Sequence, residues 1–198
     1  ALEEALAETA RMADLVDSLL TLARADEGRF DIHREPLELA PLVEDVFETA
    51  QILGEEAGIT VTLLALEPVA VQGDPVRLRQ LFLNLLTNAI KYTARGGTLT
   101  VSLERRGELA ALAVHDTGVG IAAADLPFIF DRFWRADRAR SRDAERGGFG
   151  LGLAIAQWIA HAHGGTITVA SRLGRGSTFT VTIPATELPP RGEPGAAD

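Results

Sequence analysis

The sequence predicts an α/β fold in which helices pack on a mixed, mostly antiparallel sheet, preceded by one long helix. Apolar residues recur every three to four positions in several segments, as they do in helices with one buried face. Other segments alternate between polar and apolar residues or are rich in β-branched residues, as strands are. Glycine-containing turns separate two pairs of these predicted strands, which indicates antiparallel hairpins.

The composition excludes several classes of function. The chain has 198 residues, 46% hydrophobic and 24% charged, which is enough to bury a core without cross-links. It has no cysteine, so disulfides, zinc–thiolate sites and thiol catalysis are excluded. Its net charge of −9 argues against a nucleic-acid-binding surface, which needs basic residues to displace counterions. No stretch of the sequence has the roughly 20 apolar residues of a membrane-spanning helix.

Residues 1–25 contain no glycine or proline and predict one long helix, closed by residues 26–28. Its apolar residues share one side at helical spacing: Met12, Leu15, Val16, Leu19, Leu22 and Ala23. Two interpretations of this side are open. Either a second helix, from this chain or another, covers it, or it docks on the domain that follows. The length of the stripe favours the second helix.

The next segments alternate between strand and helix. Residues 30–39 predict a short strand interrupted by Pro36, and Pro41 suits the first turn of a helix that ends near Gly58. The side chains predicted to point inward from that helix are Leu42, Val46, Ala50 and Leu53. The β-branched and leucine-rich run of residues 59–66 predicts another strand.

A helix from Pro75 to Tyr92 follows, because Asp74 is a good N-cap and proline suits the first helical position. Residues 98–105 and 109–115 predict a hairpin that turns at Gly107.

The C-terminal part begins with a glycine-containing loop, residues 116–120. The polar, arginine-rich segment 130–148 is too long for an ordinary connection, so we interpret it as a lid over a site. Residues 150–162 return to helical spacing, and residues 166–171 and 177–183 predict a second hairpin. The Pro-, Gly- and Glu-rich residues 185–198 predict a disordered tail.

Asn84, Asn88 and Lys91 share one face of the helix that ends at Tyr92. Amide oxygens are hard ligands suited to Mg²⁺, which keeps waters and bridges to substrate phosphates. Lys91, the only lysine of the chain, would neutralise phosphate charge there. The alternative is a solvated polar face of an amphipathic helix, and this pattern alone favours that alternative.

Two glycine-containing loops are further candidates for a nucleotide site. Asp116 opens a D-x-G-x-G loop with Gly118 and Gly120, where its carboxylate could accept a hydrogen bond from an exocyclic amine such as that of adenine. The alternative is a simple Asx-turn. Residues 146–153 are glycine-rich and lead into a helix, which frees backbone N–H groups to hold phosphate. A further glycine pair in residues 174–178 is read, on its own, as a hairpin turn.

In this order and spacing, these segments resemble the ATP-binding domain of sensor histidine kinases, in the Bergerat-fold group with type II topoisomerase, heat-shock chaperone and mismatch-repair ATPases. The resemblance covers residues 34–184 and implies a two-layer α/β sandwich with the nucleotide between helices and lid. The matching segments are an N box (84–93), G1 (116–120), an F box (130–133, with Trp134 and Arg135), G2 (148–153) and G3 (174–179).

The resemblance also implies a role for each matching residue. Asp116, in the loop with Gly118 and Gly120, would bind the adenine amine, Thr178 would support it, and Tyr92 would help to wall the nucleotide. At the phosphates, Asn88 with Asn84 would hold Mg²⁺, and Lys91 and Arg135 would contact phosphate. The lid backbone N–H groups would come from Gly148, Gly150, Leu151 and Gly152. Phe149 departs from the family pattern, in which a small residue is more usual.

Residues 1–28 resemble the second helix of the family's dimerisation and phosphotransfer hairpin, and residues 29–184 its catalytic domain. The hairpin's first helix and phospho-accepting histidine have no counterpart in the sequence, so we expect a piece of a longer kinase. The four histidines are interpreted as structural or exposed: His33, His115, His161 and His163.

The implied function is transfer of the ATP γ-phosphoryl group to a histidine, for relay to the receiver domain of a response regulator. The resemblance further implies a homodimer formed through the hairpin, a cytoplasmic domain, and a longer protein at the cytoplasmic side of the inner membrane. One alternative is an ATPase of the same group, but such ATPases carry a glutamate where this chain has Asn84. Another is a nucleotide-gated binding module or an anti-sigma factor, against which the leading helix argues.

Overall fold

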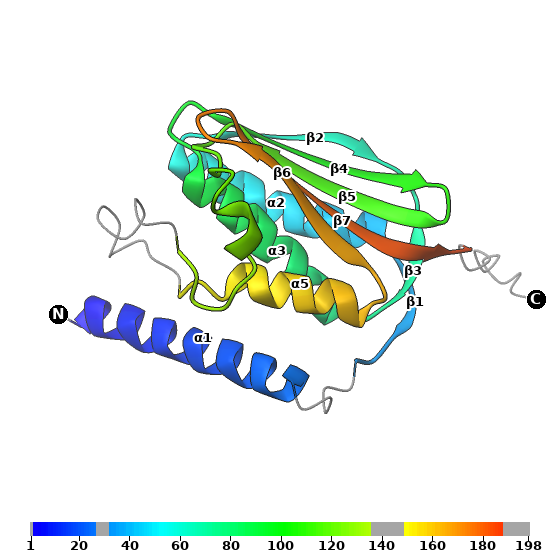
Figure 1. Cartoon of the computed structure of the whole chain (residues 1–198), viewed down its shortest axis with the longest axis horizontal. Helices are drawn as coiled ribbons and strands as arrows, with labels where there is room; N and C mark the ends of the chain where they lie inside the picture. Colours follow the sequence, from blue (N-terminus) through cyan, green and yellow to red (C-terminus); the bar gives the residue numbers. More distant parts are fainter. Residues whose placement is uncertain (1, 27–31, 136–148, 188–198) are drawn as a thin grey trace, which may run out of the picture.

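The computed structural model describes residues 2–26, 32–135 and 149–187, and its elements form two layers (Figure 1). Three helices cover one face of a sheet: α2 (Leu39–Ala57), α3 (Pro75–Tyr92) and α5 (Gly152–Ala162). The long helix α1 (Leu2–Asp26) lies along α5, on the outside of the helical layer. A short 3-10 helix, η1 (Leu126–Phe128), follows β5. The predicted two-layer α/β sandwich is confirmed.

The sheet is mixed and mostly antiparallel, as predicted. Its strand order is β1-β3-β7-β5-β4-β2, with β6 also paired to β7. Only the β2–β4 pair is parallel among the described strands. The strands are β1 (Glu35–Glu38), β2 (Thr60–Leu66), β3 (Ala70–Gly73), β4 (Thr98–Arg106), β5 (Leu109–Asp116), β6 (Thr166–Arg172) and β7 (Gly176–Thr186). The sequence did not predict β3, and β7 extends two residues into the predicted tail, whose residues 188–198 lie outside the description.

α3 begins and ends where the sequence predicts. The Asp74 carboxylate accepts hydrogen bonds from the backbone N–H groups of Val76 and Arg77, at 3.0 and 3.1 Å. α2 differs: it begins at Leu39, two residues before Pro41, which still lies in its first turn. Its buried face is also rotated from the prediction, so that Leu53 is exposed and the buried residues are Leu39, Val43, Val46, Ala50 and Gly54.

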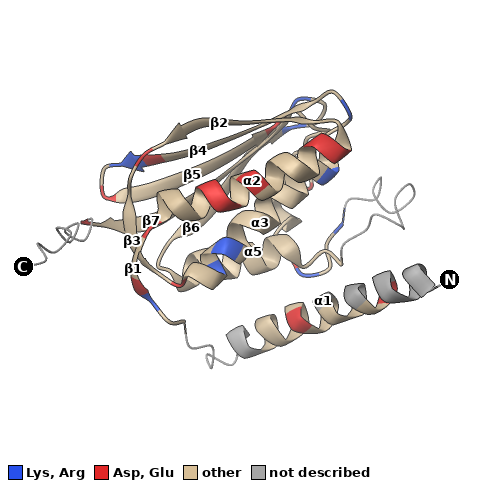
Figure 2. Cartoon of the chain, turned by 180° about the vertical axis from the view of Figure 1, so that it is seen from behind, with Lys and Arg blue, Asp and Glu red and all other residues tan. Residues whose placement is uncertain are grey.

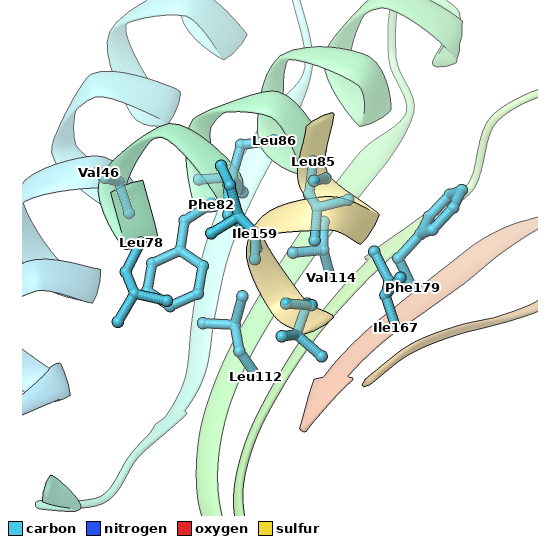
Figure 3. Close-up of a cluster of buried hydrophobic side chains, with 14 of the residues drawn as sticks. Val46, Leu78, Phe82, Leu85, Leu86, Leu112, Val114, Ile159, Ile167 and Phe179 are labelled. Carbon is cyan, nitrogen blue, oxygen red and sulfur yellow. The ribbon is translucent and has the colours of Figure 1, made fainter. Parts of the chain in front are cut away.

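One hydrophobic core fills the space between the helices and the sheet (Figure 3). α3 contributes Phe82 and Leu85, which are fully buried and meet Val114 of β5 and Ile159 of α5. Because α3 is buried on this side along its length, its opposite, half-exposed side is the one that carries polar residues. The core therefore fixes which face of α3 is available to a ligand.

The apolar side of α1 is packed on the domain at some residues and exposed at others. Leu22 is buried and Leu15 packs on the core, where α1 contacts α5. Met12, Val16 and Leu19 stay exposed in this chain, with 58%, 55% and 39% of their surface accessible. Docking on the following domain therefore accounts for one part of the stripe, and the predicted second helix stays a prediction for the other.

The distribution of charge agrees with the composition. α2 carries several acidic residues, coloured red on its ribbon in Figure 2, and five of them are exposed: Glu44, Asp45, Glu48, Glu55 and Glu56. An acidic helix face repels nucleic acid phosphates.

In the part of the chain that is described, no helix combines the length and the apolar character needed to cross a bilayer.

Candidate functional site

Asp116, at the end of β5, is a buried carboxylate beside polar residues of the neighbouring strands. Only 4% of its surface is exposed, and its Oδ1 accepts a hydrogen bond from the Gly118 N–H at 2.8 Å. Burial raises the pKa of Asp116, and the backbone N–H groups of Gly118 and Ser177 partly offset this effect. The Asx-turn considered as an alternative is therefore present, and it holds a buried acceptor rather than a solvated one.

The loop after Asp116 is wedged between α3 and the β6–β7 turn. The Val119 N–H donates to the carbonyl oxygen of Tyr92 at 3.1 Å, and the Gly174 N–H donates to the carbonyl oxygen of Val119 at 2.7 Å. A Cβ atom on Gly118 would collide with the Tyr92 carbonyl group. Gly118 is therefore required for the close approach of this loop to the end of α3.

Thr178 does not lie beside Asp116, which corrects its predicted role. In the register of β5 and β7, Asp116 is opposite Ser177 and His115 is opposite Thr178. Directly opposite residues share one face of a sheet, and successive residues alternate between faces. The Thr178 hydroxyl accordingly lies 2.9 Å from Nδ1 of His115, on the opposite face of the sheet from Asp116 and Ser177.

Ser177 and Ser171 are the polar neighbours of Asp116 that the sequence analysis missed. Ser177 is opposite both Asp116 on β5 and Ser171 on β6, and the two serine hydroxyls are 2.9 Å apart. The Ser171 hydroxyl also accepts from the Ile121 N–H at 2.8 Å and donates to the Gly176 carbonyl at 2.9 Å. The alternation along β7 was the available signal: the apolar residues Phe179, Val181 and Ile183 are buried, so Ser177 shares their face and Thr178 does not.

The predicted phosphate-binding residues of α3 lie on its half-exposed side. Asn84, Asn88, Lys91 and Tyr92 are all partly exposed. The Asn84 side-chain amide donates to the carbonyl oxygen of Gly152 at 3.1 Å and so ties α3 to the first turn of α5. Nζ of Lys91 lies 5.1 Å from the centre of the Tyr92 ring, within the range of a cation–π contact.

The F box and the start of G2 meet in the structure. The Phe133 N–H donates to the carbonyl oxygen of Gly150 at 3.0 Å. Phe133 has a left-handed backbone (φ 63°), which is uncommon for a bulky residue and stores strain. Gly150 also has a positive φ, and a Cβ there would lie 2.8 Å from the Trp134 carbonyl oxygen. The ends of the predicted lid are therefore side by side.

Some of the remaining predicted lid residues belong to the part of the chain that the structure describes, and others do not. Leu151 is buried at the N-cap of α5, Gly152 is exposed in its first turn, and Arg135 is half-buried. Gly148 and four arginines of the segment, Arg138, Arg140, Arg142 and Arg146, lie outside the described residues, whereas Arg132 is described and exposed. Phe149, which departs from the family pattern, is 38% exposed.

The histidines occupy structural or exposed positions, as predicted. His33, His115 and His161 are exposed, whereas His163 is buried after α5. Nε2 of His163 accepts from the Asp74 N–H at 3.0 Å, and its Nδ1–H donates to the Ile159 carbonyl at 2.7 Å. These bonds need a neutral ring, and burial lowers the pKa of His163.

The site fits a nucleotide with a metal ion that arrives on the phosphates. Asp116 and Ser177 offer buried acceptors to an amine, while Asn84, Asn88 and Lys91 offer amide oxygens and a cation to phosphates. Within the described ranges, no group of three or more acidic or histidine side chains could hold a metal alone. Mg²⁺ fits such a site, because it is commonly bound by few protein oxygens together with substrate phosphates.

Comparisons with known proteins agree with this geometry. The family model described as "Histidine kinase-, DNA gyrase B-, and HSP90-like ATPase" matches residues 73–187. The sensor histidine kinase CusS of Escherichia coli (strain K12) is 39% identical over 180 residues, which are 91% of this chain and 37% of CusS. The chain therefore spans little more than a third of the length of this relative.

Two solved structures share the fold over nearly the whole chain. The histidine kinase AdeS of Acinetobacter baumannii has a TM-score of 0.77 at 26% identity, over 94% of this chain and 84% of that one. Full-length ShkA in complex with AMPPNP has a TM-score of 0.79 at 30% identity, over 95% of this chain and 39% of that one. Both alignments are long enough to include α1 as well as the sandwich.

Proposed function

The chain belongs to the family of histidine kinase-, DNA gyrase B- and HSP90-like ATPases, and we propose that it transfers the γ-phosphoryl group of ATP to a histidine of a sensor histidine kinase. One observation favours transfer over hydrolysis. α3 carries amides at Asn84 and Asn88 and contains no Asp or Glu from Pro75 to Tyr92. It therefore has no carboxylate to activate water, which the alternative ATPase function would need.

The base of the nucleotide is assigned to the end formed by Asp116 and Ser177, called the base end below. Asp116 is buried and held by the Gly118 N–H, so its position is set before a ligand arrives. A carboxylate at this place accepts a hydrogen bond from the exocyclic amine of adenine and gives no such bond to a carbonyl group. Tyr92 follows Lys91 at the adjoining end of α3, where it would line the nucleotide.

The phosphates are assigned to the phosphate end, formed by Asn84, Asn88, Lys91 and the first turn of α5. Asn88 and Asn84 would offer oxygens to Mg²⁺, which supplies charge neutralisation when bound with the nucleotide. Lys91 neutralises phosphate charge directly, and the N-terminus of α5 at Gly152 favours an anion through its dipole. Arg135, half-buried at the F box, is proposed to contact the γ-phosphate.

The residues of this chain position the γ-phosphoryl group and stabilise its charge. An imidazole nitrogen attacks the γ-phosphorus, a new N–P bond forms, and the bond from that phosphorus to the β-phosphate oxygen breaks, which leaves ADP. Such a transfer needs alignment and charge stabilisation more than covalent participation by the protein. The nucleophile would come from a phosphotransfer hairpin, because none of the four histidines of this chain lies at the phosphate end.

The partners follow from this assignment. We assign the phosphoryl group's next acceptor to the receiver domain of a response regulator, as in two-component systems. The exposed residues Met12, Val16 and Leu19 of α1 would pair with other helices of a hairpin in a homodimer. Relatives named as sensor kinases motivate a longer protein held at the inner membrane with this domain in the cytoplasm.

A label-transfer assay tests the proposal. The chain is incubated with Mg²⁺ and γ-labelled ATP, alone and with a separately supplied hairpin that carries a phospho-accepting histidine. We expect acid-labile label on the hairpin and none on the chain. ATP binding without label on any acceptor, or rapid release of labelled phosphate into solution, would contradict transfer and favour a nucleotide-gated module or an ATPase.

A further inference from the structure

The Ser171 hydroxyl lies at a junction of three segments around the base end. It accepts a hydrogen bond from the Ile121 N–H of the loop after β5, at 2.8 Å. It donates to the carbonyl oxygen of Gly176, at the start of β7, at 2.9 Å. Its third neighbour is the hydroxyl of Ser177, also at 2.9 Å. One side chain of β6 therefore joins β6, β7 and the loop that begins at Asp116.

The number of protons in this cluster fixes the direction of each hydrogen bond. A serine hydroxyl has one proton and can accept two hydrogen bonds. The Gly176 carbonyl can only accept, so the Ser171 proton goes to it. Ser177 must then donate its own proton to Ser171, because Ser171 has no second proton to give. The Ser177 oxygen is left with lone pairs only.

Ser177 is the cross-strand neighbour of Asp116, so two acceptors stand side by side at the base end. Oδ1 of Asp116 accepts a hydrogen bond from the Gly118 N–H at 2.8 Å, which holds the carboxylate in place beside Ser177. A base that presents an amine to two acceptors is bound, whereas one that presents a carbonyl group is repelled. The direction of the Ser171 bonds therefore bears on which purine is accepted.

We propose that Ser171 is a positioning residue for base selection: through its bonds to Ile121, Gly176 and Ser177, it holds the base end as a pair of acceptors that prefers a purine with a 6-amino group. This inference rests on the proposed function, because it requires the base to lie at Asp116. It adds a residue that has no place in the N, G1, F, G2 or G3 segments and that touches neither the base nor the phosphates.

The structure provides a matched control on the same two strands. Thr166 and Thr182 also form a hydroxyl pair across β6 and β7, with their oxygens 2.9 Å apart. This pair lies at the opposite end of the β6–β7 ladder from Ser171 and Ser177. Thr166→Ala therefore removes a comparable hydrogen bond without touching the base end.

The test compares the affinities of the full chain for ATP and for inosine triphosphate, which differs by a carbonyl group in place of the 6-amine. The wild-type chain and Thr166→Ala should prefer ATP to the same degree. Ser171→Ala should weaken ATP binding about three- to tenfold, the effect of one lost hydrogen bond, and leave inosine triphosphate binding nearly unchanged. Ser171→Thr, which keeps a hydroxyl, should restore most of the preference.

Each other outcome overturns a defined part of the account. Equal weakening of both nucleotides by Ser171→Ala, or an unchanged preference, would show that Ser171 is only structural. A wild-type chain with no preference for ATP would instead overturn the assignment of the base to Asp116, and this inference with it. If Ser171→Ala does not fold, Ser177→Ala takes its place, because it removes the acceptor that Ser171 orients and keeps the bonds to Ile121 and Gly176. The same loss of preference is then expected, and an unchanged preference contradicts the inference.

Discussion

The base end and the phosphate end of the candidate site are built from different kinds of structure. Asp116 and Ser177 lie on β5 and β7, two strands joined along their whole register, and Ser171 adds bonds to the loop beside them. Asn84, Asn88 and Lys91 lie on a helix that is tied to α5 through the Asn84–Gly152 bond. Paired strands hold side chains at fixed positions, whereas two packed helices can shift against each other. The base end is therefore preformed, and the phosphate end is the one that a nucleotide and its metal ion can adjust.

The largest effect on the affinity for ATP is expected from Asp116→Asn, which alters the preformed base end. The substitution replaces a charged acceptor with an amide whose NH₂ group can oppose the adenine amine. Loss of a charge-assisted hydrogen bond in a buried place costs about 3 kcal/mol, or roughly a hundredfold in affinity. Calorimetric titration with ATP measures it, and Asp125→Asn is the control, since Asp125 caps η1 without a side-chain hydrogen bond. Retained affinity in Asp116→Asn would refute the assignment of adenine to this carboxylate.

Asn84 and Asn88 separate the two functions of the phosphate end. Asn88→Ala should weaken ATP binding roughly tenfold in Mg²⁺ and have little effect when the metal is chelated, because its proposed contact is to the ion. Asn84→Ala should weaken binding under both conditions, because it also removes the bond to Gly152. Titrations with and without chelator measure the difference. Identical metal dependence in the two variants would contradict distinct roles.

Lys91→Gln is expected to have a smaller effect, restricted to the phosphates. Loss of one partly exposed cation should weaken ATP binding about three- to tenfold and leave adenosine binding unchanged. Arg79→Gln is the control, since Arg79 lies on the same helix but pairs with Asp45 at 2.7 Å. Competition against a fluorescent nucleotide gives both affinities. An equal loss for adenosine would place Lys91 at the base end.

The smallest effect on nucleotide binding, and a clear one on stability, is expected at His163. Its ring joins the C-terminal end of α5 to the N-terminus of α3 and is faced by Arg34, which lowers its pKa, and Asp74, which raises it. Burial dominates and lowers the pKa of His163 below the ordinary value of 6.5, so the unfolded chain binds the proton more readily. Stability should be fully present above about pH 6.5 and decrease as the pH falls below it.

Urea denaturation between pH 7.5 and 5 measures this dependence. His163→Gln should flatten it in that window, and His161→Gln, at an exposed position two residues earlier, should not. A pH dependence that persists in His163→Gln would assign the effect to other groups.

Local sequence signals predicted the parts of the fold that are determined locally. The start of α3 follows from Asp74 and Pro75, and the β4–β5 hairpin follows from a glycine turn between two clear strands. β3 was missed, because its four residues have no pattern of their own and form a strand through pairing with β1 and β7. The predicted strand of residues 30–39 ran into Leu39, where α2 begins, because Leu39 is held there by tertiary burial and not by a cap.

The residues of the candidate site also divide into those that a local sequence signal identifies and those that depend on tertiary contacts. Asp116 and the polar face of α3 could be identified from motifs, because each motif is contiguous. The residue opposite Asp116 depends on the register between β5 and β7. If that register is predicted wrongly by one residue, Thr178 replaces Ser177 as the neighbour of Asp116, although the Thr178 side chain lies on the other face of the sheet. The Asn84–Gly152 bond joins residues 68 positions apart, which no local pattern contains.

The difference between the two ends is tested most directly by the magnesium dependence of affinity, compared between ATP and adenosine in the wild-type chain. A preformed base end predicts that adenosine binds measurably and with the same affinity with or without Mg²⁺. An adjustable phosphate end predicts that Mg²⁺ strengthens the binding of ATP. Adenosine binding that requires Mg²⁺, or ATP binding that ignores it, would contradict the account.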